Sequence, residues 1–120
     1  METTIPTSVS FDNVLGVELE VIGPKPGATR GDPVESGVEL ASNGLVHTGV
    51  WEVTPGTFPG VKDGICELMH FVAGRGTITG DDGTVTRIGP GVVMFTPDGW
   101  RGTWDVQETV RKTYVIVRTR

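Results

Sequence analysis

Short alternating runs of hydrophobic and polar residues, interrupted by glycine, proline and aspartate, extend over most of the chain. Alternation with a period of two residues is typical of β-strands that bury one face. No stretch has the periodicity of an amphipathic helix of useful length. The pattern predicts strands at residues 45–54, 65–73, 76–79, 84–88, 92–96, 100–106 and 109–118.

Turn-forming sequences separate most of these segments. Gly80-Asp81-Asp82-Gly83 predicts a hairpin turn, and Gly89-Pro90-Gly91 predicts a tight turn before the next strand. Pro55-Gly56 and Pro59-Gly60 predict a loop after the first of the strands. About seven or eight short strands with regular turns favour an all-β sandwich or small barrel.

The N-terminal third has a different character. Residues 1–40 are rich in turn formers, such as Gly23-Pro24 and Pro26-Gly27, and predict an irregular arm with one or two short edge strands. Residues 41–120 are then expected to form a single barrel. A chain of 120 residues is long enough for one buried core.

Composition narrows the possible partners. The net charge of −5 argues against nucleic acids and anionic membranes. The sequence contains no apolar run of about 20 residues and no secretory signal pattern. The single cysteine, Cys66, excludes an intramolecular disulfide, and we therefore expect a cytoplasmic protein.

Charge is unevenly distributed along the chain. Acidic residues dominate positions 1–46, whereas basic residues dominate positions 101–120. We expect the acidic arm to pack on the basic last strand, within one subunit or between two. Short exposed sheet edges are a pairing liability, which adds to the expectation of a homodimer.

Two spacings resemble the paired motifs of the cupin superfamily. Glu67 is followed after six residues by Gly74, and Gly91 is followed by Pro97 and Gly99. Residues 49–56, 99–104 and 110–114 are similar to the cupin subgroup related to ureidoglycine aminohydrolase and the ethanolamine-utilisation cupin, which has many members of unknown function. The resemblance implies a cupin-type double-stranded β-helix, a jelly-roll barrel with a ligand site in its interior.

The chain departs from metal-binding cupins at the ligand positions. The resemblance places histidines at Val61–Asp63 and at position 102. The sequence has no histidine in the first window, and position 102 is a glycine, Gly102. The only histidines are His47 and His70, and His70 lies three residues from Glu67 along a strand, so it points to the opposite face. Imidazole gives such sites their metal affinity, so we predict neither a metal site nor another cofactor.

Strand alternation indicates what replaces the metal. If Glu67 faces inward, Lys112 and Tyr114 are the inward polar residues of the last strand. A buried carboxylate and a buried ammonium are each costly alone, and pairing removes most of that cost. We therefore predict a polar centre of Glu67, Lys112 and Tyr114, which are also the candidate catalytic residues, with Gly102 leaving open space. The predicted ligand contacts are Trp51, Met69, Phe71, Trp100, Gly102 and Trp104.

Three functions stay open at this point. The first is a metal-independent cupin that binds a small polar metabolite, such as a ureide, a sugar derivative or a carboxylate, with or without acid–base catalysis. The second is a metal-dependent enzyme of the ureidoglycine aminohydrolase type that uses Glu67, His47 and residues of a partner subunit. The third is a non-catalytic barrel whose function lies in its dimer surface.

Overall fold

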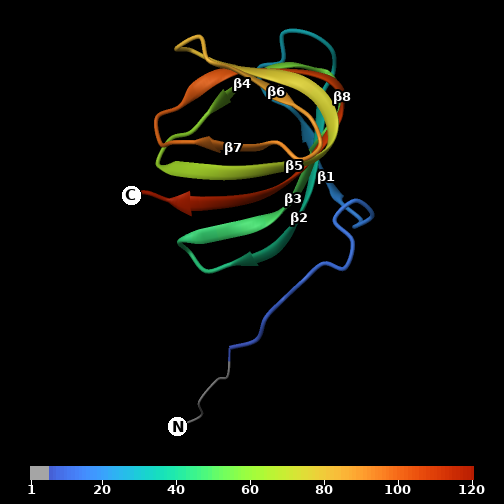
Figure 1. Ribbon diagram of the computed structural model, residues 1–120, viewed down its shortest axis with the longest axis vertical. Coiled ribbons are helices and arrows are strands. Elements are labelled where there is room, and N and C mark those ends of the chain that lie inside the picture. The colour runs from blue at the N-terminus through green and yellow to red at the C-terminus, as the bar shows by residue number, and fades with distance from the viewer. Residues whose placement is uncertain (1–5) are drawn as a thin grey trace.

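The computed structural model describes residues 6–120, which form eight strands and no helix (Figure 1). The predicted all-β class is therefore confirmed. No helix capable of crossing a membrane occurs in the described part of the chain. The strands are β1 (Glu20–Pro24), β2 (Val34–Ser42), β3 (Val46–Val53), β4 (Gly56–Val61), β5 (Ile65–Gly80), β6 (Val85–Ile88), β7 (Val93–Thr96) and β8 (Arg101–Arg118).

The strands form one antiparallel sheet that curls around a shared interior (Figure 1). The strand order is β1-β2-β3-β8-β5-β6, while β4 pairs with β8 and β7 pairs with β5. Strands β5 and β8 are the long elements that connect the two ends of the barrel. The first part of β8 pairs with β4 and the last part of β5, and the rest of β8 pairs with β3 and the first part of β5.

Two predicted breaks turn out to be bends within single strands. Residues 65–73 and 76–79 belong to one strand, β5, and residues 100–106 and 109–118 belong to β8. Gly74 has a φ of 98°, and a Cβ there would lie 2.3 Å from the carbonyl oxygen of Thr109. The β5–β8 register also shifts between Phe71 and Gly76. Glycine therefore lets the two strands bend while in close contact, where the sequence suggested a strand end.

The loop predicted around Pro59-Gly60 is wrong, because this segment forms β4. Pro59 pairs with Thr103 of β8. Proline has no N–H to donate, and it is tolerated in strands that form backbone hydrogen bonds to a neighbouring strand on one side only. On the other side of β4, Arg30 forms an isolated bridge to Thr57. The proline is therefore compatible with a strand in this position.

The N-terminal residues contribute two strands, β1 and β2, to the sheet. β2 pairs with β3 and runs through residue 40, the expected end of the arm. Ahead of β1, the Arg111 guanidinium of β8 donates hydrogen bonds to the carbonyl oxygens of Val14, Leu15 and Val17 at 3.0, 3.2 and 3.0 Å. The arm thus contacts a basic residue of the last strand, but through backbone carbonyls instead of acidic side chains.

Candidate functional site

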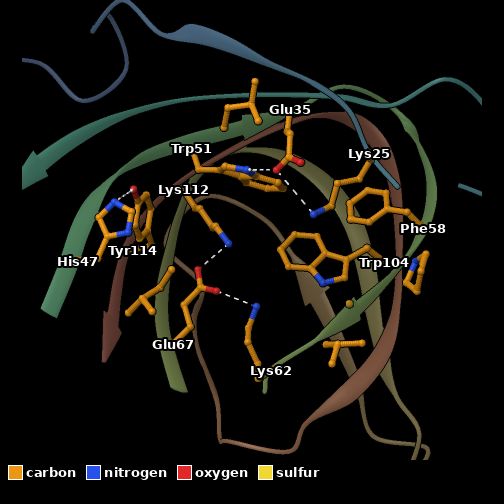
Figure 2. A pocket seen from close by; sticks show the side chains of 15 residues that line it. Lys25, Glu35, His47, Trp51, Phe58, Lys62, Glu67, Trp104, Lys112 and Tyr114 are labelled. Carbon is orange, nitrogen blue, oxygen red and sulfur yellow. Dashed lines mark hydrogen bonds and ion pairs between the residues drawn. The ribbon is translucent and has the colours of Figure 1, made fainter. Parts of the chain in front are cut away.

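A cavity of about 330 Å3 lies among the inward-facing side chains of the barrel (Figure 2). Its lining comes from β1, β2, β3, β4, β5 and β8, and from Lys25 and Lys62 just after β1 and β4. Polar and charged groups share this lining with aromatic rings, so the cavity combines charge with flat apolar surfaces. The polar residues are Lys25, Glu35, His47, Lys62, Glu67, Lys112 and Tyr114, and the aromatic walls are Trp51, Phe58 and Trp104.

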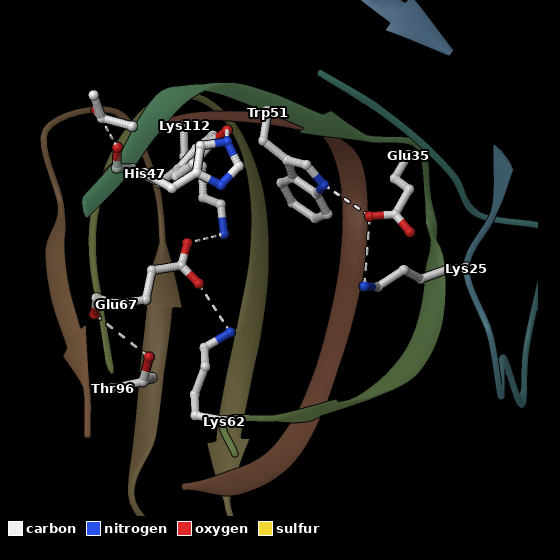
Figure 3. Close-up of polar contacts among 10 residues, drawn as sticks. Lys25, Glu35, His47, Trp51, Lys62, Glu67, Thr96 and Lys112 are labelled. Carbon is white, nitrogen blue, oxygen red and sulfur yellow. Dashed lines mark hydrogen bonds and ion pairs between the residues drawn. The ribbon is translucent and has the colours of Figure 1, made fainter. Parts of the chain in front are cut away.

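Glu67 is the centre of the polar contacts (Figure 3). Lys112 Nζ donates to its Oε2 at 2.7 Å, and Lys62 Nζ lies 2.9 Å from its Oε1. The Thr96 hydroxyl on β7 donates to the Glu67 backbone carbonyl at 3.4 Å. The structure thus brings the expected Glu67–Lys112 pair together and adds a second cation. Lys62 was not among the predicted site residues. It lies in the Val61–Asp63 window where the cupin resemblance places histidines, so its position in the motif could have identified it as a site residue.

Burial and charge together set the protonation of this centre. Glu67 and Lys112 are 3% and 5% exposed. Burial alone would raise the pKa of Glu67, but the charges of Lys112 and Lys62 outweigh it and hold that pKa below its usual range. Burial lowers the pKa of Lys112 to about 8, against the opposing attraction of Glu67. One ionised carboxylate is therefore shared by two ammonium groups near neutral pH.

Aromatic rings enclose the same ammonium group. Lys112 Nζ lies 4.4 Å from the centre of the Trp51 ring and 5.1 Å from that of Trp104. A cation at this distance over an indole face is attracted by the negative face of the ring. Trp51 and Lys112 are direct partners in the β3–β8 ladder, which fixes this arrangement. Both tryptophans therefore hold the positions expected of cavity walls.

A second charged pair lies beside Trp51. Its indole Nε1 donates to Glu35 Oε1 at 2.9 Å, and Lys25 Nζ lies 3.6 Å from the same oxygen. Lys25 also lies 5.3 Å from the centre of the Phe58 ring. Lys25 and Glu35 were not expected at the site, because they come from the N-terminal region and no motif contains them.

The expectation of open space at Gly102 is wrong. A Cβ at this position would lie 2.5 Å from the carbonyl oxygen of Thr79 and 2.5 Å from Cζ2 of Trp100. The Trp100 ring therefore fills the space that a histidine would need. Trp100 packs against the core and is not among the described residues that line the cavity.

Met69 and Phe71 point inward as expected but belong to the core. Both are fully buried, and neither is among the described residues that line the cavity. Phe71 contacts Trp104 with 5.9 Å between ring centres. Neither residue is therefore placed for the direct ligand contact that was expected of it.

Tyr114 lines the cavity but does not bond to Glu67. Its hydroxyl lies 3.1 Å from His47 Nε2, and His47 in turn lies 3.2 Å from Glu39 Oε1. Burial raises the pKa of Tyr114, and the negative charges of Glu39 and Glu67 add to this effect. The structure therefore separates the predicted polar trio into a Glu67–Lys112 pair and a Tyr114–His47 pair.

These residues do not fit a metal ion of the cupin kind. Within residues 6–120, no group of three or more His, Cys, Asp or Glu side chains is arranged to hold one. Both oxygens of Glu67 face ammonium groups, which repel a cation. His70 is exposed on the outer side of β5, as alternation predicted.

The family model of the EutQ-like cupin domain matches residues 40–114. The chain belongs to the EutQ-like cupin family. The jelly-roll expectation is thereby confirmed. No match to this cupin was found among curated proteins.

Solved structures show the same fold in several bacteria. The EutQ protein of Clostridium difficile is 21% identical, with a TM-score of 0.63 over 72% of this chain and 70% of that one. A DUF861-family protein of unknown function from Pseudomonas syringae is 23% identical, with a TM-score of 0.76 over 88% of this chain. This cupin covers only 46% of that protein's length. A DUF861-family protein from Thermotoga maritima is 32% identical, with a TM-score of 0.51 over 54% of this chain and 73% of that one.

Proposed function

We propose that this cupin binds a small metabolite through an anionic group, in a site centred on Glu67 and Lys112. The observation that carries the proposal is the joint presence of three ammonium groups and two indole walls in one cavity. A carboxylate-bearing compound fits this lining better than a neutral ureide or sugar. Ureide acids and sugar acids remain within the proposed class.

Charge counting supports an anionic ligand. Among the lysines and carboxylates of the lining, Lys25, Lys62 and Lys112 face only Glu35 and Glu67, which leaves one excess positive charge. An excess charge in a partly enclosed site attracts an opposite charge more strongly than it would in water. The cavity volume of about 330 Å3 suits a compound of metabolite size.

The same groups allow proton transfer. Glu67 contacts two ammonium groups, one of which, Lys112, has a pKa lowered to about 8 by burial. A general acid or base acts best when its pKa lies near the working pH. Acid–base chemistry on a bound ligand is therefore part of the proposal, with Lys112 as the group that exchanges the proton.

Thermal denaturation with added ligands tests the binding proposal. The probes are malonate, gluconate, hydantoate (a ureide acid) and neutral glucose, each added to the wild-type protein. We expect at least one anion to raise the melting temperature, and glucose to have a smaller effect. Lys112→Met should lose the response, and Glu67→Gln should strengthen it because it leaves the lining with one more uncompensated positive charge. Arg75→Met should keep the wild-type response, because Arg75 is exposed and lies outside the cavity. An unchanged response in both site variants would contradict the proposed centre.

One surface feature favours a homodimer as well. The outer side of β7, β5 and β8 exposes Phe95, Val93, Leu68 and Val115 at 58, 61, 45 and 36%. Leu68 is the ladder partner of both Phe95 and Val115, so these side chains form one patch. Contiguous exposed apolar surface of this kind is typical of protein interfaces. We propose that a second copy of the chain covers it, which would give the homodimer expected from the sequence.

Light scattering of the protein as it elutes from a size-exclusion column gives its molar mass and so tests for the dimer. Phe95→Glu should yield monomers from a dimeric wild type. Val85→Glu is the matched control, because Val85 is similarly exposed at 57% but lies on β6, away from the patch. A monomeric wild type, or an equal effect of both substitutions, would contradict the interface.

A further inference from the structure

The distribution of lysine and arginine over the fold is uneven. The chain has three lysines and seven arginines. All three lysines line the cavity described above, and no arginine does so among the described residues. Arginine stays charged under all ordinary conditions, whereas a lysine can lose its proton and become a nucleophile. The primary amines of the side chains are therefore gathered at the one place where a ligand is expected.

Lys112 has the surroundings of a reactive amine. Its Nζ is enclosed by the rings of Trp51 and Trp104 and is bonded to Glu67 Oε2 at 2.7 Å. Burial lowers its pKa to about 8. A minor fraction of the Lys112 side chains is then neutral near pH 7. A lysine in an apolar pocket beside another cationic group is a recognised form of activated nucleophile.

We propose that Lys112 forms an imine with the carbonyl group of a small oxo acid. This inference rests on the proposed anion-binding function of the same cavity, and it adds the class of ligand. The ligand's carboxylate lies toward Lys25, whose Nζ is 5.7 Å from the same Trp51 ring that Lys112 contacts. Among the described residues, the ion-pair partner of Lys25 Nζ is Glu35, at 3.6 Å, and Lys25 can exchange it for a ligand carboxylate.

The step balances without any further reactant. Glu67 accepts a proton from the Lys112 ammonium, and the neutral amine attacks the carbonyl carbon. A C–N bond forms while the C=O π electrons move to the oxygen. Lys62, on the other oxygen of Glu67, protonates that oxygen and takes back the proton that Glu67 accepted. The carbinolamine nitrogen then gives up a second proton through the same groups, and the oxygen leaves as water. An ammonium ion and a carbonyl compound become a protonated imine and water, with no oxidation or reduction.

Reductive trapping tests the imine. The wild-type protein is incubated with pyruvate, reduced with borohydride and analysed by mass spectrometry of the intact chain and of its peptides. With only three lysines, the peptide map distinguishes Lys112 from Lys25, Lys62 and the terminal amine. We expect one reduced adduct per chain, on Lys112. Acetone, which lacks the carboxylate, should label Lys112 to a much lower extent at the same concentration.

Variants separate the roles of the lysines. Lys112→Met should abolish the adduct, and Lys25→Met should keep it on Lys112 but require a higher pyruvate concentration. If Lys112→Met does not fold, the peptide map of the wild type still decides. Absence of label on Lys112, or equal labelling of Lys112 and the terminal amine, would overturn the proposal.

Ligand binding and imine formation give separate readouts, the melting temperature and the reduced adduct. If pyruvate raises the melting temperature but leaves no adduct on Lys112, the imine is wrong and the anion site stands. If malonate, gluconate, hydantoate and pyruvate all leave the melting temperature unchanged and no adduct forms, the binding proposal fails too.

Discussion

Lys62 Nζ lies 2.9 Å from Glu67 Oε1, and this contact gives the buried carboxylate a second cation beside Lys112. The centre is therefore asymmetric: either lysine can be lost while Glu67 keeps a partner, but loss of Glu67 leaves two ammonium groups without one. An unpaired buried charge is far more costly than a missing pair. Glu67 is accordingly the residue on which the stability of the site depends.

Replacing Glu67 should cost more stability than replacing either lysine. For Glu67→Gln we expect the free energy of unfolding to fall by about 3–5 kcal/mol, as measured by urea denaturation at pH 7. Lys62→Met should cost less, because Lys112 still neutralises Glu67. Glu108→Gln is the control, since Glu108 is 63% exposed in its pair with Arg75, and surface substitutions of this kind cost about 0.5 kcal/mol or less. Equal losses in Glu67→Gln and Glu108→Gln would contradict the buried triad.

Lys112 should give the protein a characteristic alkaline response. Its pKa falls from 10.5 to about 8 in the folded state because of burial, so between these values the unfolded chain holds the extra proton. The free energy of unfolding should therefore rise with pH in this window. From pH 8 to 10, wild type should gain about 2 to 3 kcal/mol relative to Lys112→Met.

The comparison with the variant isolates this effect. Tyr114, whose pKa is raised by burial, acts in the opposite direction at higher pH but is present in both proteins. The other charged groups near Lys112, namely Glu67, Lys62, Lys25 and Glu35, are also common to both. A stability gap that stays constant from pH 8 to 10 would show that Lys112 keeps its ordinary pKa.

Gly102→Ala should destabilise the barrel. The added Cβ would meet the Thr79 carbonyl oxygen and the Trp100 ring, both at 2.5 Å, so the strands must move apart. Overpacking of this kind costs about 1–3 kcal/mol. Gly89→Ala is the matched control, because nothing lies within 4 Å of a Cβ there. Similar melting temperatures for Gly102→Ala and wild type would contradict the filled space.

Arg111 should hold the N-terminal arm on the barrel. Its guanidinium bonds three carbonyl oxygens of residues 14–17, which the single ammonium of a lysine cannot reproduce in the same geometry. In Arg111→Lys we expect faster amide hydrogen exchange in residues 13–17. Arg87→Lys, an exposed change on β6, should leave that exchange as it is in wild type. Equal exchange rates in all three proteins would mean that the arm is held by other contacts.

The sequence predicted the parts of the structure that follow from strand alternation. Alternation placed Glu67, Lys112 and Trp104 on the inner face, and the cost of a buried charge predicted the Glu67–Lys112 contact. It also placed Tyr114 inward, but a period of two does not specify a rotamer. The hydroxyl of Tyr114 turns toward His47 and away from Glu67.

Other parts of the site depend on contacts that no local pattern contains. Lys62 follows strand β4, which the sequence predicted as a loop because of Pro55-Gly56 and Pro59-Gly60. Lys25 and Glu35 reach the cavity only because β1 and β2 extend the sheet beside β3. At Gly102 the pattern gave the correct face but not the neighbour, because the ring of Trp100 folds back from the turn before β8.

Nuclear magnetic resonance of isotope-labelled lysine tests the central claim most directly, because the chain yields only three side-chain signals. Malonate, gluconate, hydantoate and pyruvate are titrated into the wild-type protein, with glucose as the neutral control. We predict that at least one anion moves the Lys62 and Lys112 signals together, in a saturable way, and that the Lys62 signal loses this response in Lys112→Met. If all three lysine signals stay in place with every compound, the cavity is not an anion-binding site.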